Sequence, residues 1–174
     1  MRRLWYISLI LGILSPGAGA LPAQSKDAAR SVKPINVNGI ERLLHDRKGK
    51  ILFLNVWATW CQPCVEEFPD LVKVYEEYRD SPVDIVAISV DYPDEIESKI
   101  VPFLTSLNVP FTVYVADVKK DEDFINALNP AWSGAVPATF IFDAHGKQQK
   151  FMFGQKNYET FKADIDTAVN SEQR

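Results

Sequence analysis

The residues best suited to chemistry in this 174-residue chain are its only two cysteines, Cys61 and Cys64, which form a C-x-x-C motif. Two thiols at this spacing can form a reversible disulfide or bind a soft metal ion. A disulfide with a purely structural role would stabilise the fold little at this spacing, because closing so short a loop removes little chain entropy. A zinc site needs further ligands, and His45 and His145 stand far apart in the sequence without ligand spacing. The motif therefore favours redox chemistry.

The residues around the motif predict that a buried strand turns into a helix at Cys61. Residues 51–56 form an apolar run of β type, and apolar side chains recur at helical spacing after the motif. Free N–H groups and the positive end of the helix dipole at such a junction stabilise a thiolate and lower its pKa. Pro63 fits early in a helix, where its missing N–H has no partner to lose. Cys61, nearest the helix end and expected to be the more exposed thiol, is the predicted nucleophile.

The segment W-A-T-W-C-Q-P-C at residues 57–64 resembles the thioredoxin superfamily, and within it the exported TlpA/ResA-like thiol-disulfide oxidoreductases. The resemblance covers roughly residues 35–170. It implies an α/β thioredoxin fold with a mixed parallel and antiparallel central sheet flanked by helices. It also implies that Cys61 attacks a disulfide in a partner protein and that Cys64 then attacks Cys61 and releases the reduced partner.

Glu67 is the predicted proton carrier for Cys64. It lies three residues after Cys64, so one helical turn places both on the same face. In ResA-like proteins an acidic residue at this place of the motif is functional. The alternative is that the carboxylate only stabilises the N-terminus of the helix. That structural role is the one expected for Glu66. Thioredoxin itself carries a buried Asp in the preceding strand. Here that place is taken by Asn55, which cannot titrate, so the predicted proton route shifts to Glu67.

The partner-binding residues are predicted from the same resemblance. Members of the superfamily have a cis-proline opposite the C-x-x-C motif, and Val136-Pro137 matches that place, although the trans form is the ordinary alternative. In the cis form the backbone of Val136 lies beside Cys61, where an extended partner segment can pair with it. Trp60, next to Cys61, is expected to form contact surface. Trp57 is expected in the core, while Trp132 fits a core position or the border of the groove equally well.

The charges near the motif predict a reductase. No Lys, Arg or His lies between Lys50 and Lys73, whereas Glu66, Glu67 and Asp70 follow the cysteines. Nearby carboxylates disfavour a thiolate, and a less stabilised thiolate makes the dithiol a better reductant. Two rival functions remain open: a peroxiredoxin-like thiol peroxidase, whose P-x-x-x-T-x-x-C pattern is not matched here, and a non-enzymatic Cu(I)-binding chaperone module, whose relatives use C-x-x-x-C.

The N-terminus predicts export. Residues 1–20 combine two arginines, an apolar run and an A-x-A cleavage pattern, so they read as a signal peptide, with cleavage after residue 23 as an alternative. An uncleaved N-terminal membrane anchor is the other interpretation. Residues 21–34 are expected to be a flexible linker, and residues 35–174 a thioredoxin-like domain. The predicted setting is periplasmic or extracytoplasmic.

The expected partners are disulfide-containing protein substrates and a membrane electron donor of the DsbD/CcdA type, and the resemblance suggests cytochrome c maturation. A net charge of −4 without a run of Lys or Arg argues against a nucleic-acid partner. We expect a monomer with no cofactor and no metal. The remaining expected elements are helices at 38–49, 93–107 (kinked at Pro102), 121–128 and 157–169, strands at 51–57, 83–90, 111–115, 134–142 and 148–153, and a hairpin turn at 143–147.

Overall fold

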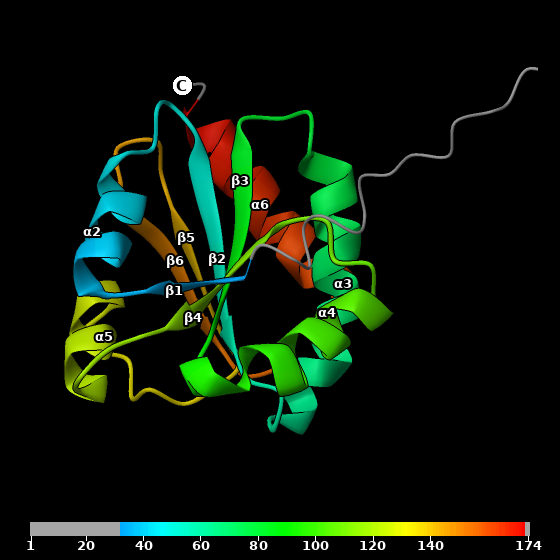
Figure 1. Ribbon diagram of the computed structural model, residues 1–174. Coiled ribbons are helices and arrows are strands. Elements are labelled where there is room, and N and C mark those ends of the chain that lie inside the picture. Colours follow the sequence, from blue (N-terminus) through cyan, green and yellow to red (C-terminus); the bar gives the residue numbers. More distant parts are fainter. Residues whose placement is uncertain (1–31, 173–174) are drawn as a thin grey trace, which may run out of the picture.

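A six-stranded sheet forms the centre of the protein, and helices lie against both of its faces (Figure 1). The computed structural model describes residues 32–172. The strand order is β1-β4-β3-β2-β5-β6; β1, β4, β3 and β2 run parallel, and β5 and β6 are antiparallel to their neighbours. The strands are β1 (Lys33–Ile35), β2 (Ile51–Trp57), β3 (Val83–Ser89), β4 (Thr112–Ala116), β5 (Ala138–Phe142) and β6 (Gln148–Phe153). The predicted mixed sheet flanked by helices is confirmed.

The helices form two layers, α3 with α6 on one face of the sheet and α2 with α5 on the other (Figure 1). Each layer covers its own apolar cluster, because the central strands are buried on both faces. Their bounds are α2 (Val37–His45), α3 (Gln62–Tyr78), α4 (Val101–Ser106), α5 (Asp121–Leu128) and α6 (Tyr158–Glu172).

The central strand β2 shows why the sheet needs both layers. All seven of its residues are buried. Because side chains alternate along a strand, Phe53 and Trp57 face the α3–α6 layer, whereas Leu54 and Val56 face α2 and α5. Asn55 is the one polar residue of the strand, and the alternation places it on the α3 side, between Phe53 and Trp57. Strand β2 thus ends in the core, directly before the segment that carries the cysteines.

Three expectations about local structure were wrong. The helix near residue 38 begins earlier, because Asn36 and not Asn38 caps it: the Asn36 Oδ1 atom accepts the Gly39 N–H at 2.9 Å. Strand β1 was missed, so two residues assigned to the linker, Lys33 and Pro34, belong to the sheet edge, where a proline is tolerated. The strand expected from residue 134 begins only at Ala138.

The helix expected over residues 93–107 is interrupted. The chain forms the short turns η1 (Pro93–Glu95) and η2 (Ile96–Ile100) before α4 starts, and Pro102 lies in the first turn of α4. Pro102 has no N–H to donate to the preceding turn, and the N–H of Val101 bonds the carbonyl of Ile96, five residues back. The proline therefore changes the type of helix.

The predicted signal peptide and most of the predicted linker lie outside the described residues. Within residues 32–172, none of the helices has the length and apolarity that crossing a bilayer requires. The predicted hairpin turn is present: Asp143 N–H bonds the carbonyl of Lys147 at 2.9 Å, and Gly146 adopts a left-handed conformation (φ 81°).

Candidate active site at the Cys61–Cys64 disulfide

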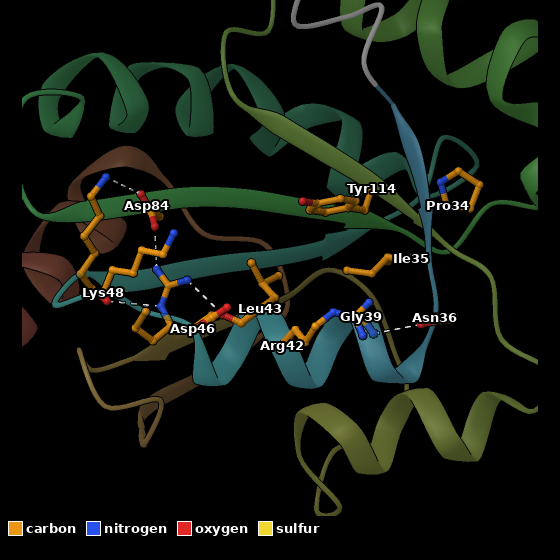
Figure 2. Close-up of a pocket in the computed structure, with 12 residues that line it drawn as sticks. Pro34, Ile35, Asn36, Gly39, Arg42, Leu43, Asp46, Lys48, Asp84 and Tyr114 are labelled. Carbon is orange, nitrogen blue, oxygen red and sulfur yellow. Dashed lines mark hydrogen bonds and ion pairs between the residues drawn. The ribbon is translucent and has the colours of Figure 1, made fainter.

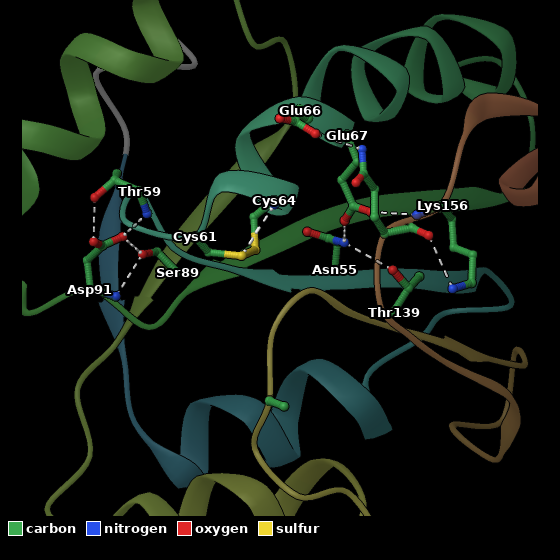
Figure 3. Close-up of a disulfide and its surroundings, with 12 residues drawn as sticks. Asn55, Thr59, Cys61, Cys64, Glu66, Glu67, Ser89, Asp91, Thr139 and Lys156 are labelled. Carbon is green, nitrogen blue, oxygen red and sulfur yellow. Dashed lines mark hydrogen bonds between the residues drawn. A yellow bond between two sulfur atoms is a disulfide. The ribbon is translucent and has the colours of Figure 1, made fainter.

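Cys61 and Cys64 form a disulfide at the N-terminus of α3, directly beyond the end of β2 (Figure 3). Cys61 is the N-cap residue of α3, and its sulfur accepts the Cys64 N–H at 3.3 Å. Cys61 is 6% exposed and Cys64 is fully buried. Cys61 is thus the more accessible of the two, as expected, although it is less open than the sequence suggested. The roles of nucleophile and resolving thiol stay predictions.

The loop that carries Cys61 is held by a buried carboxylate from the neighbouring strand. Asp91 follows β3, and its two oxygens accept the Thr59 N–H at 2.9 Å and the Thr59 hydroxyl at 2.6 Å. The Ser89 hydroxyl donates to Asp91 at 2.5 Å. These bonds fix the residues between β2 and Cys61. Asp91 was not among the residues predicted from the sequence. The signal that could have indicated it is a polar Ser-x-Asp pair at the end of a buried parallel strand beside β2.

Glu67 is a buried carboxyl group one helical turn beyond Cys64. It is 1% exposed, and its two oxygens accept the Asn55 side-chain N–H at 2.9 Å and the Lys156 backbone N–H at 2.9 Å. Burial raises its pKa from 4.5 to about 7, against the lowering effect of these two hydrogen bonds and of the Lys156 charge. A carboxyl group with this pKa can release and take up a proton near neutral pH.

The second anchor of Glu67 comes from the segment between β6 and α6. Lys156 presents its backbone N–H to Glu67, while its Nζ atom donates to the carbonyls of Phe153, Gly154 and Gln155. Because the hydrogen bond uses a backbone group, no side-chain pattern in the sequence marks it. No cation lies near Glu67 in the sequence, but the fold brings Lys156 close enough for its charge to lower the pKa of Glu67.

Asn55 joins Glu67 to the sheet. Its Nδ2 atom donates to Glu67 at 2.9 Å and to the Thr139 hydroxyl on β5 at 3.0 Å. Its Oδ1 atom is buried and has no hydrogen-bond partner among residues 32–172. In Figure 3 the amide lies between the disulfide and Glu67, with its oxygen on the side of the cysteines.

The peptide bond between Val136 and Pro137 is cis, as the resemblance implied. Pro137 is buried directly before β5, and Val136 is half-buried and packs against the apolar cluster that contains both cysteines. Trp132 lies in the core, where its Nε1 atom donates to the carbonyl of Ala135 at 2.9 Å. Trp57 is also in the core, as expected, with its ring 4.5 Å from that of Phe68.

Exposed aromatic side chains gather at the same edge of the sheet as the disulfide. Trp60 is 65% exposed, and Tyr92 and Phe153 are the other large apolar side chains that the described residues expose. Trp60 follows β2 and Tyr92 follows β3, and these strands are parallel neighbours. Phe153 pairs with Ala138, which in turn pairs with Val56 near the end of β2. All three therefore lie at the edge that carries Cys61.

A pocket of about 600 Å³ lies elsewhere, between α2 and strands β1 and β4 (Figure 2). Several basic side chains line it, and the most buried, Arg47, bonds Asp84 at 2.8 Å and the carbonyl of Leu43 at 3.0 Å. No predicted site residue lines this pocket. In residues 32–172, no three His, Cys, Asp or Glu side chains are grouped as a metal site requires.

Comparison with known proteins gives one consistent answer. The AhpC/TSA family matches residues 25–150. The thiol-disulfide oxidoreductase ResA of Geobacillus thermodenitrificans is 30% identical over 132 residues, which are 76% of this chain and 71% of that protein. ResA of Bacillus subtilis is 37% identical over 121 residues, 68% of this chain and 62% of that protein. A thioredoxin-family thiol:disulfide interchange protein from Chlorobium tepidum has a similar structure, with a TM-score of 0.61 and 25% identity, covering 71% of this chain and 83% of that one.

Proposed function

We propose, from the premise that this chain belongs to the AhpC/TSA family and is a ResA-type thiol-disulfide oxidoreductase, that it reduces disulfides in partner proteins outside the cytoplasm. The observation that carries the proposal is the Cys61–Cys64 pair at a helix N-terminus, with the buried carboxyl group of Glu67 one turn behind it.

The reaction follows from the order of the two thiols. The thiolate of Cys61 attacks one sulfur of a partner disulfide, whose S–S bond breaks, and the other partner sulfur leaves with the electron pair and binds a proton. Cys64 then loses its proton and attacks Cys61, which restores the internal disulfide and releases the second partner thiol. The partner gains two electrons and the enzyme loses two. A donor dithiol, itself oxidised to a disulfide, must return them.

Glu67 is suited to carry the proton of Cys64. Cys64 is fully buried, so its proton needs a group inside the protein to receive it. A pKa of about 7 leaves Glu67 divided between its two protonation states at neutral pH, the condition under which one group serves both as base and as acid.

The reductase direction rests on charge. Glu66, Glu67 and Asp70 lie in the first part of α3, and carboxylates there disfavour a thiolate at Cys61. Two cations oppose them in part: the Lys156 charge lowers the pKa of Glu67, and Lys73 forms an ion pair with Asp70 at 2.7 Å. Glu66 is bonded only to the side-chain amides of Gln62 and Gln155 among residues 32–172. A reduction potential well above that of glutathione would contradict this direction.

The partner is proposed to dock on the edge that carries Trp60, Tyr92 and Phe153. Exposed aromatic side chains are enriched at protein interfaces, because they bury a large area at little entropic cost. An extended partner segment would pair with the backbone at Val136, beside Pro137. Export rests on the N-terminal sequence alone, and cytochrome c maturation and a membrane donor of the DsbD/CcdA type rest on the resemblance.

Trapping tests the proposal. Cys64→Ala should accumulate a mixed disulfide through Cys61, which mass spectrometry identifies together with the partner, whereas Cys61→Ala should not. Trapping by Cys61→Ala alone would invert the two roles. Efficient turnover of hydrogen peroxide, with no reduction of protein disulfides, would instead support the peroxidase alternative. Tight Cu(I) binding without disulfide reduction would support the metal chaperone.

A further inference from the structure

The side-chain oxygen of Asn55 is a buried hydrogen-bond acceptor that receives no hydrogen bond from residues 32–172. Asn55 is 1% exposed, and its Oδ1 atom has no hydrogen-bond donor in the part of the chain that the structure describes. Leaving such an atom unpaired destabilises the fold, so an unpaired acceptor in the core calls for an explanation.

The orientation of the amide is fixed by its other end. The Nδ2 atom donates to Glu67 and to the Thr139 hydroxyl, and an ionised carboxylate can only accept. Turning the amide over would place two acceptor oxygens against each other. The Oδ1 atom therefore points away from Glu67, toward the disulfide (Figure 3).

The cysteines supply the missing donor when the disulfide is reduced. In the oxidised protein the Cys64 sulfur carries no hydrogen, because both sulfurs are bonded to each other. On reduction a donor dithiol gives two electrons and becomes a disulfide, the bond between Cys61 and Cys64 breaks, and each sulfur can bind a proton. A buried S–H group then appears on the side of Asn55 where the unpaired oxygen lies.

We propose that Asn55 Oδ1 accepts the S–H hydrogen bond of Cys64 in the reduced protein. This inference rests on the proposed function, because it assigns Cys64 as the protonated, buried thiol of the pair. The hydrogen bond stabilises the thiol over the thiolate, so it keeps Cys64 neutral while Cys61 is the nucleophile. The same amide holds Glu67 through its nitrogen, and an amide adds no charge of its own beside Cys64.

The S–H stretching band of Cys64 tests the proposal directly. In Cys61→Ser, Cys64 is the only thiol, and a hydrogen-bonded S–H absorbs in the infrared at a lower frequency than a free one. Adding Asn55→Leu, which has a similar volume but no acceptor, should move the band to higher frequency. Adding Thr139→Val, which removes the other partner of the amide nitrogen, should leave the band in place. An unmoved band in the Asn55→Leu protein would overturn the proposal.

A second measurement uses the redox equilibrium. At pH 8, where Glu67 is ionised and can only accept from the amide, Asn55→Leu should make oxidation of the dithiol by glutathione disulfide about fivefold more favourable, the factor that about 1 kcal/mol of hydrogen bonding gives. An unchanged equilibrium would count against the bond. If the Leu variant does not fold, a crystal structure of the reduced wild-type protein decides: another donor on Oδ1 would refute the proposal. Neither measurement involves a partner, so failure here is distinct from failure of trapping.

Discussion

Replacing Glu67 by glutamine should change how the stability of the oxidised protein depends on pH. Burial raises the pKa of Glu67 from 4.5 to about 7, so between these pH values the folded protein keeps a proton that the unfolded chain has released. The folded state therefore loses stability as pH rises through this window, and the full loss is present above it. The difference between 4.5 and about 7, at about 1.4 kcal/mol for each pH unit, gives about 3 kcal/mol.

The assay is denaturant unfolding of wild type and Glu67→Gln from pH 4 to pH 8.5, with both proteins oxidised. The disulfide keeps the cysteines from titrating, and the two proteins differ only at residue 67. The free energy of unfolding of the variant, minus that of wild type, should rise by about 3 kcal/mol across the window. The glutamine nitrogen must face one of two donors, Asn55 or Lys156, but this penalty does not vary with pH.

Glu66→Gln is the matched control, because Glu66 is the exposed neighbour on the same helix and its partners are the exposed Gln62 and Gln155. Its difference curve should be flat over the whole range. A flat curve for Glu67→Gln as well would mean that the buried carboxyl group titrates as it does in water. In that case Glu67 could not exchange a proton with Cys64 near neutral pH.

Three further substitutions separate binding, loop position and fold. Trp60→Ala should raise the KM for a partner disulfide and leave kcat unchanged in steady-state kinetics, with a change in unfolding free energy below about 0.5 kcal/mol, since the side chain is mostly exposed. Asp91→Ala should lower the unfolding free energy by about 2–3 kcal/mol and slow the exchange of Cys61 with a small disulfide, because it frees the Thr59 N–H. Arg47→Met should lower the free energy of unfolding by about 1–3 kcal/mol and leave disulfide reduction unchanged, because it removes the donor to the Leu43 and Ile51 carbonyls far from the cysteines, while Asp84 keeps its ion pair with Lys50.

The sequence predicted the junction of β2 and α3 because every signal for it is local. A run of buried side chains defines the strand, and the cysteines, Pro63 and the apolar helical spacing follow without interruption. The relation of Glu67 to Cys64 is also local, since one helical turn separates them. The exposed Trp60 and the buried Cys64 follow from the same geometry.

Contacts between distant parts of the chain could not be predicted in this way. The bond from Lys156 to Glu67 spans 89 residues, and that from Asn55 to Thr139 spans 84. Asp91 lies 32 residues from the Thr59 that it holds. Two asparagines, Asn36 and Asn38, stand near the start of the first helix, and the sequence alone does not say which of them caps it.

The polar groups beneath the disulfide make sense as a compromise between stability and proton exchange. Asn55, Glu67 and Thr139 are buried among aromatic and aliphatic side chains, and apolar residues of similar size there would pack at least as well. The ionised Glu67 alone costs about 3 kcal/mol above neutral pH. The group that carries this cost lies one helical turn from Cys64. Cys64 is the fully buried sulfur of the pair, and it must lose a proton in every cycle. An aspartate at position 55 would place a second negative charge next to Glu67. The Asn55 amide instead holds Glu67 by a hydrogen bond and adds no charge, so Glu67 is the only titratable group among these three residues.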